Sequence, residues 1–232
     1  PQLEAVGRIA SSEERIAQYT RLLEHALHDT PSASLPSLVR TYVDGAVLDP
    51  VNTTGAGLLV GRHMLAHLAT QLAAAHIPAN ILCTIVSDTL ATCEASSIMG
   101  DDELGPWRVL LAEQYASLSR WRDAAQALQS ITPHAARRIP QLSFAQLCVR
   151  VVELWLHDLP SHVAEAEQAI KRANSAILDE RDNKALVHEL WSYHARVLAI
   201  QHRFMEAAAR YMDLPHADMY AAVYAIISPP SA

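Results

Sequence analysis

The sequence has little glycine, few aromatic residues and no stretch that alternates valine, isoleucine and threonine. Glycine accounts for 7 of the 232 residues and aromatic residues for 6%, whereas half of the chain is apolar. Without an alternating pattern, nothing in the sequence indicates a half-buried β-strand. Alanine and leucine dominate instead, and both lose little free energy on entering a helix. The composition therefore predicts an all-α fold.

The sequence also lacks an excess of positive charge, closely spaced cysteines and long apolar runs. The net charge of −7 argues against a general nucleic-acid-binding protein, which needs a basic surface. Cys83, Cys93 and Cys148 have no close spacing, so we expect reduced thiols in an intracellular protein. No apolar run approaches the roughly 18 residues of a membrane span, and no signal peptide is seen. Because the first residue is proline, we expect the natural chain to be longer.

The first hundred residues predict four helices that cannot be aligned as repeats. The expected spans are Glu13–His28, Leu35–Leu48, Leu58–Ala75 and Pro78–Ser96. A polar segment, Val51–Gly57, contains glycine and is expected to be a connector of low helical content. We therefore treat residues 1–100 as a first domain of irregular helical repeats.

Residues 101–232 contain three segments that can be laid over one another as helical hairpins. Ala124, Ala166 and Ala207 near the start of each second helix are 42 and 41 residues apart. The matching columns lie twelve residues earlier (Ala112, Leu154, Ala195), three residues earlier (Trp121, Val163, Phe204) and four residues later (Leu128, Ile170, Tyr211). The helix spacing is that of tetratricopeptide (TPR) hairpins, although the period exceeds their usual 34 or so residues.

The clearest hairpin is Trp191–Tyr211, with a break at residues 201–203. Trp191 and Phe204 are expected in its core, and small alanines such as Ala207 allow the two helices to approach closely. Stacked hairpins of this kind predict a right-handed superhelix. A further short helix, Met219–Ile227, is expected, and no polar cap follows it. We therefore expect the natural chain to continue.

Motifs that carry chemistry are few. His63 and His67 in HMLAH have a spacing that suits one metal ion, but the glutamate of HExxH and a third ligand are missing. An ordinary helix face is the simpler interpretation, with a helical metal-binding enzyme as the alternative. Gly55, Gly57 and Gly61 form GxGxxxG, one residue longer than the dinucleotide fingerprint and without a preceding strand. No catalytic residue, cofactor or metal is predicted.

One charged segment differs from the acidic chain around it. Between Ser119 and Val152 there is a single acid, Asp123, and five arginines: Arg120, Arg122, Arg137, Arg138 and Arg150. Scattered surface arginines are the simpler interpretation. The functional interpretation is a basic strip for an acidic protein partner, at Arg120, Arg122, Arg137 and Arg138, because a guanidinium engages carboxylates in pairs.

Several of these segments resemble the helical-repeat region of the COP9 signalosome subunit 4 family. The resemblance is carried by Trp107–Leu128, His194–Tyr211 and the helix AEAEQAIKRA at Ala164–Ala173, and the upstream QYTRLLEHAL, LVRTYVDGAV and GRHMLAHL segments follow in the same order. It implies a non-catalytic subunit of the cytoplasm and nucleus, in which the repeats lead into a winged-helix (PCI) module. No winged helix fits before Ala232.

The resemblance also implies partners. The complex removes the ubiquitin-like protein Nedd8 from cullin-RING ubiquitin ligases with zinc held by another subunit, whose HxH motif does not occur in this sequence. This chain is implied to contact other signalosome subunits and to bind the cullin-RING ligase through its repeats. Two further alternatives stay open: a related proteasome-lid subunit, and an RNA-binding superhelix, which the negative charge disfavours. No membrane contact is expected.

Overall fold

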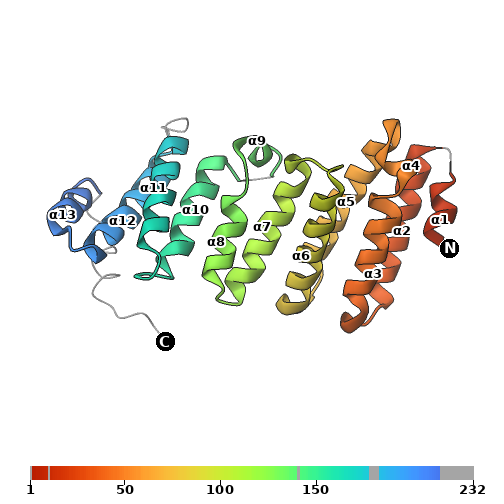
Figure 1. Ribbon diagram of the computed structural model, residues 1–232, viewed down its shortest axis with the longest axis horizontal. Coiled ribbons are helices and arrows are strands. Elements are labelled where there is room, and N and C mark those ends of the chain that lie inside the picture. The colour runs from red at the N-terminus through yellow and green to blue at the C-terminus, as the bar shows by residue number, and fades with distance from the viewer. Residues whose placement is uncertain (1, 10, 140–141, 178–182, 215–232) are drawn as a thin grey trace. The chain divides into compact units, whose positions relative to one another are not determined.

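The structure is a computed structural model, shown in Figure 1, and it describes residues 2–9, 11–139, 142–177 and 183–214. These residues form α-helices joined by short turns, and none of the described residues lies in a β-strand. The predicted all-α class of neighbouring packed helices is therefore confirmed. The predicted helix Met219–Ile227 lies outside the described residues.

The chain divides into two compact units. Unit 1 comprises Pro1–Arg120 and Ser130–Pro140, and unit 2 comprises Trp121–Gln129 and Gln141–Ala232. The expected domain boundary at residue 100 thus falls inside unit 1. The two helices of the first predicted hairpin fall in different units.

Unit 1 consists of helices that pack on their neighbours in space. Its α-helices are α1 (Gln2–Gly7), α2 (Ser12–Asp29), α3 (Leu35–Tyr42), α4 (Pro50–Thr53), α5 (Leu58–Ala74), α6 (Ala79–Ser96), α7 (Asp101–Ser117) and α9 (Pro133–Ala136). Helix α2 packs on α5, α3 on α6, and α7 on α5, α6 and α9. The four helices expected in residues 1–100 are confirmed, whereas the short α1 and α9 were not predicted.

Local sequence sets where these helices begin and end. The Ser11 hydroxyl accepts a hydrogen bond from the Glu14 amide at 3.4 Å, and Glu13 and Glu14 lie in the first turn of α2. Both features stabilise a helix N-terminus. The helix ends at Asp29, and its C-cap Thr30 is extended because proline disfavours helical geometry in the residue before it, here Pro31. Its buried face carries Tyr19 and Leu23, which are fully buried in the core.

The connector between α3 and α5 is more ordered than the sequence predicts. Val43–Val47 form a π-helical turn, Pro50–Thr53 form α4 and Gly55–Gly57 form a 3₁₀ turn. The Asp49 carboxylate caps α4 by accepting from the Val51 amide at 2.8 Å. The expectation of low helical content over residues 51–57 is therefore wrong, because an aspartate cap followed by proline starts a helix even within a polar segment.

Two of the clustered glycines are explained by close packing in this region. A Cβ atom at Gly57 would lie 1.9 Å from the Val51 carbonyl oxygen, and one at Gly61 would lie 2.8 Å from the carbonyl oxygens of Asn52 and Val47. No side chain fits at either position. The GxGxxxG pattern thus serves the turn that leads into α5, in agreement with its interpretation as a loop entering a helix.

Unit 2 contains the best-matched hairpins. Its α-helices are α8 (Trp121–Gln129), α10 (Phe144–Leu156), α11 (Val163–Ile177), α12 (Lys184–Ile200) and α13 (Phe204–Met212). Helix α10 packs on α8, α11 and α12, and α12 packs on α11 and α13. The predicted break in the last hairpin is confirmed, since α12 ends at Ile200 and His202 has a φ of 61°.

Most residues of the repeat columns are buried or half-buried, and one column lies at the starts of helices. Trp121, Val163 and Phe204 are the first residues of α8, α11 and α13. The fully buried positions of the columns are Ala112, Ala124, Leu128, Leu154, Ala166, Ile170, Ala195 and Ala207, and the half-buried ones are Trp121, Val163, Trp191 and Tyr211. Phe204 is the exception because 62% of it is exposed. The expectation that Phe204 lies in the core is wrong: α13 buries Ala207 toward α12, and Phe204 begins the helix away from that contact.

Candidate interaction surface

The four arginines of the predicted strip fall in both units. Arg120, Arg137 and Arg138 belong to unit 1, and Arg122 belongs to unit 2. All four are exposed. Arg120 follows α7, Arg122 lies in the first turn of α8, and Arg137 and Arg138 follow α9. Whether the four act together as one strip stays a prediction.

Arg138 is held by carboxylates that are distant in the sequence. Its Nη1 donates to Glu103 Oε1 at 3.0 Å, and its Nε lies 3.5 Å from Asp102 Oδ2. Both acids lie in the first turn of α7. The side chain of Glu103 is only 8% exposed, so its position is fixed by the surrounding residues. Its ion pair with Arg138 therefore fixes the guanidinium close to the end of α9. The positive charge of Arg138 is therefore largely neutralised within unit 1.

Glu103 is the centre of a larger ion-pair network. Its Oε1 also lies 3.2 Å from Arg62 Nε of α5, and its Oε2 accepts from the Gly100 amide at 3.0 Å. Nearby, Arg108 of α7 pairs with Glu94 of α6 and Asp101, at 3.1 and 3.2 Å. These two groups of ion pairs connect α7 to α5, to α6 and to the residue Arg138 after α9, and so help to hold the packing of unit 1.

The other arginines of the segment have different surroundings. The Arg120 guanidinium lies 4.3 Å from the centre of the Tyr115 ring, a cation–π contact that fixes its position while leaving it exposed. Arg137 is the residue directly after α9, and Arg122 lies on the exposed side of α8. Arg150 forms an ion pair with Glu153, one turn further along α10. The local excess of positive charge is therefore smaller than the sequence suggests.

A second surface was missed by the sequence interpretation. Three large apolar side chains on α13 are exposed: Phe204 by 62%, Met205 by 85% and Met212 by 76%. Ala208 and Ala209 of the same helix are also exposed. A hydrophobic pattern shows that a helix has an apolar face, but here apolar residues surround almost the whole helix. The pattern therefore could not indicate which face is buried.

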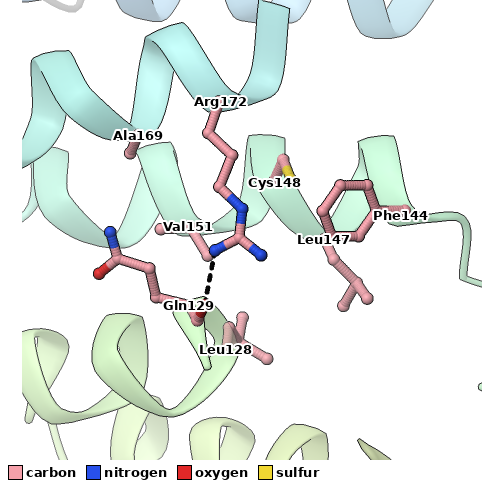
Figure 2. A pocket seen from close by; sticks show the side chains of 8 residues that line it. All are labelled: Leu128, Gln129, Phe144, Leu147, Cys148, Val151, Ala169 and Arg172. Carbon is pink, nitrogen blue, oxygen red and sulfur yellow. Dashed lines mark hydrogen bonds between the residues drawn. The ribbon is translucent and has the colours of Figure 1, made fainter. Parts of the chain in front are cut away.

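Unit 2 contains a small cavity, shown in Figure 2, where α8, α10 and α11 meet. It has a volume of about 10 Å³ and is lined by Leu128, Leu147, Cys148 and Arg172 among others. This volume suffices for no more than a water molecule. Burial raises the pKa of the Cys148 thiol to about 11, although nearby Arg172 opposes this, so the group is a neutral thiol at neutral pH. The cavity has neither the space nor the nucleophile for catalysis.

Unit 1 has a larger groove of about 380 Å³ between α1, α2 and α3. Its apolar lining includes Leu3, Leu22 and Leu38, and its polar lining includes the hydroxyl groups of Ser37 and Thr41. Both hydroxyls donate to backbone carbonyls of their own helix region, at 2.8 and 2.9 Å. Among the residues that the structure describes, no charged side chain lines this groove, so they supply no acid–base pair there.

The histidine pair His63 and His67, for which an ordinary helix face is the simpler interpretation, gains no third ligand among the described residues. His63 is exposed on α5, and His67 Nε2 lies 3.4 Å from Gln71 Nε2. Among the residues that the structure describes, no three histidine, cysteine or acidic side chains are grouped to hold a metal ion.

Cys93, like Cys148, is a buried thiol, and burial raises its pKa to about 11. No helix within the described ranges combines the length and apolar character needed to cross a membrane.

Comparison with known proteins identifies relatives over most of the chain. It is 29% identical to COP9 signalosome complex subunit 4 of Caenorhabditis elegans over 224 residues, which cover 90% of this chain and 54% of the relative. The subunit 4 proteins of Arabidopsis thaliana and Drosophila melanogaster are each 25% identical, over 89% and 88% of this chain. The chain spans about half the length of these curated relatives. No family model matches it. The resemblance to signalosome subunit 4 is thus confirmed.

Proposed function

We propose that this chain is the helical-repeat region of a COP9 signalosome subunit and acts as a non-catalytic scaffold. The observation that carries the proposal is the match to subunit 4 of three organisms, at 25–29% identity over 88–90% of the chain. Packed helical repeats agree with a scaffold, because they display long exposed surfaces rather than an enclosed site. By this proposal, its partners include other signalosome subunits, and it works in the cytoplasm and nucleus.

The finer proposal is that the repeats contribute to cullin deneddylation by binding the cullin-RING ligase. Arg120, Arg122 and Arg137 would contact acidic side chains of the ligase, since they are exposed and a guanidinium engages a carboxylate through two parallel hydrogen bonds. Arg138 has a different role, because Glu103 and Asp102 already occupy its guanidinium. Charge-reversal variants for the ligase surface should therefore leave Arg138 unchanged.

A pull-down with charge-matched variants tests this proposal. The test variant combines Arg120→Glu, Arg122→Glu and Arg137→Glu, and the control combines Arg8→Glu, Arg21→Glu and Arg40→Glu, three arginines that are also exposed. Both change the net charge equally. We expect the wild type and the control to bind a purified cullin-RING ligase equally well, and the test variant to bind about tenfold more weakly, the effect of about 1.4 kcal/mol.

Other outcomes separate the parts of the proposal. Equal weakening by both variants would show that only net charge matters, and no effect of the test variant would remove these arginines from the binding surface. If the wild-type chain binds neither the ligase nor the remaining signalosome subunits, the scaffold role is contradicted. Association with proteasome-lid subunits in place of signalosome subunits would instead favour the related lid scaffold.

A further inference from the structure

Helix α13 has one buried face and one exposed apolar face. It packs on α12 through Ala207, which is 3% exposed, while Met205 and Met212 are 85% and 76% exposed. Met205, Ala209 and Met212 are spaced at i, i+4 and i+7, so they share one stripe of the helix. Inner helices of unit 2, such as α10, have described neighbours on several sides. The stripe on α13 is a surface suited to contact with another helix.

The composition of the stripe indicates the chemistry of its partner. Arg203 and Glu206 form an ion pair with an Nε–Oε1 distance of 2.8 Å, and Arg210 lies 3.8 Å from Asp213. These charges neutralise each other on one flank of α13, so the stripe between that flank and Phe204 requires no charge from a partner. Alanine at its centre allows close approach, and methionine adapts to an irregular surface. The fitting partner is an uncharged apolar helix.

We propose that this face is covered by the chain's own segment Met219–Ile227, which lies outside the described residues. Helix α13 ends at Met212, the structure describes the chain as far as Leu214, and 18 residues follow Leu214. Four residues, 215–218, separate Leu214 from Met219, a length typical of connections between antiparallel neighbouring helices. The segment MYAAVYAII carries no charge.

The pattern of this segment matches the stripe in spacing as well as in charge. Met219, Val223 and Ile226 are at i, i+4 and i+7, the same spacing as Met205, Ala209 and Met212. An antiparallel arrangement places Met219 near Met212 and Ile226 near Met205. Covering the face in this way removes the side chains of Met205 and Met212 from water, and burial of apolar surface stabilises such a contact. The exposed stripe is thus half of a helix pair.

Engineered cysteine pairs in the whole 232-residue chain test the arrangement. The test pairs are Met205→Cys with Ile226→Cys, and Met212→Cys with Met219→Cys. The control is Glu206→Cys with Ile226→Cys, since consecutive helical residues point about 100° apart. A disulfide needs Cβ atoms within about 4.5 Å, so link formation reports close proximity. The three native thiols are buried and do not compete readily.

We expect at least one test pair to form a disulfide within a single chain under mild oxidation, several times faster than the control pair. Links between chains in its place would show that a second copy covers the face and would overturn the proposal. Equal rates for the test and control pairs would also overturn it, because they would show no preferred face.

Hydrogen exchange gives an independent measurement that does not need a new bond. Met205→Glu should accelerate amide exchange both in α13 and in residues 219–227, by about tenfold or more, as expected when at least 1.4 kcal/mol of apolar burial is lost. Acceleration confined to α13, with residues 219–227 unaffected, would overturn the proposal. The control Ala164→Glu introduces the same charge at an exposed position of α11 and should change neither region.

Discussion

Arg172 of α11 donates a hydrogen bond from Nη1 to the backbone carbonyl oxygen of Gln129, the last residue of α8, at 2.5 Å (Figure 2). The two residues are 43 positions apart in the sequence. The guanidinium also lies 5.2 Å from the centre of the Phe144 ring at the start of α10. One side chain therefore joins three helices of unit 2 and supplies a donor to a C-terminal helix carbonyl, which has no partner within its own helix.

Replacing Arg172 with alanine should destabilise unit 2. The substitution removes a charged hydrogen bond to a carbonyl and a cation–π contact, which together contribute about 1 to 3 kcal/mol. Urea denaturation followed by circular dichroism measures the change. Lys171→Ala is the matched control, because Lys171 is the preceding residue of the same helix and is exposed. Equal stability of the two variants would show that the Arg172 contact contributes nothing.

The buried alanines of the repeat columns should not tolerate enlargement. Ala166 of α11 has no exposed surface, so Ala166→Leu would force its helix away from α10 at a cost of about 1 to 3 kcal/mol. Ala164→Leu provides the control, since Ala164 lies in the same helix on its exposed side. Thermal melting of both variants should separate them, with a lower melting temperature for Ala166→Leu alone. Indistinguishable melts would contradict the packing of α11 on α10.

Much of the fold could be predicted from the sequence because helices signal themselves locally. Apolar spacing, proline and capping residues placed α2, α5 and α6 close to their observed bounds. The short α9 was missed, since it contains too few residues to show a period. The same limit applies to α1, and the π-helical turn Val43–Val47 has no local signature that distinguishes it from the α-helix it continues.

The candidate surface was predictable only in part, because contacts between distant residues decide it. The sequence shows that Arg138 lies in a segment poor in acids, but Glu103, 35 residues away, forms an ion pair with it. Likewise, the period of α13 is compatible with several buried faces, and only the packing of Ala207 on α12 reveals that Phe204 and Met205 are exposed. The buried alanines were easier to predict, since their spacing recurs in three segments.

Reversing the charge of Arg138 should reduce stability, whereas reversing that of Arg137 should not. Arg138→Glu places a third carboxylate beside Asp102 and Glu103, so repulsion replaces attraction at a half-exposed pair, an effect of about 1 kcal/mol. Arg137→Glu is the neighbouring exposed control. Chemical denaturation in low salt should show the difference, and added salt should reduce it because exposed charges are screened. If Arg138→Glu leaves the free energy of unfolding unchanged, the ion pair has no structural role.

The stability of unit 2 should fall as the pH is lowered from 7 to 5, because of His194. Burial lowers the pKa of His194, a residue of α12, below its usual value of 6.5. Arg210 and Arg203 lower this pKa further, while Glu167 and Glu206 act in the opposite direction. As the pH falls, His194 therefore binds a proton near pH 6.5 in the unfolded chain but only at a lower pH in the folded chain. Stability is lost as the pH falls through 6.5 toward the lower folded pKa, with a slope of at most about 1.4 kcal/mol per pH unit for this group.

Removing the imidazole tests this assignment. His194→Gln should flatten the dependence of the unfolding free energy on pH between 7 and 5, measured by urea denaturation at several pH values. His76→Gln is the control, since His76 lies in an exposed turn between α5 and α6. If His194→Gln and the wild type keep parallel profiles, proton uptake by His194 does not contribute to acid sensitivity. A flattened profile in the His76 variant would transfer the effect to that exposed histidine and contradict the role of burial.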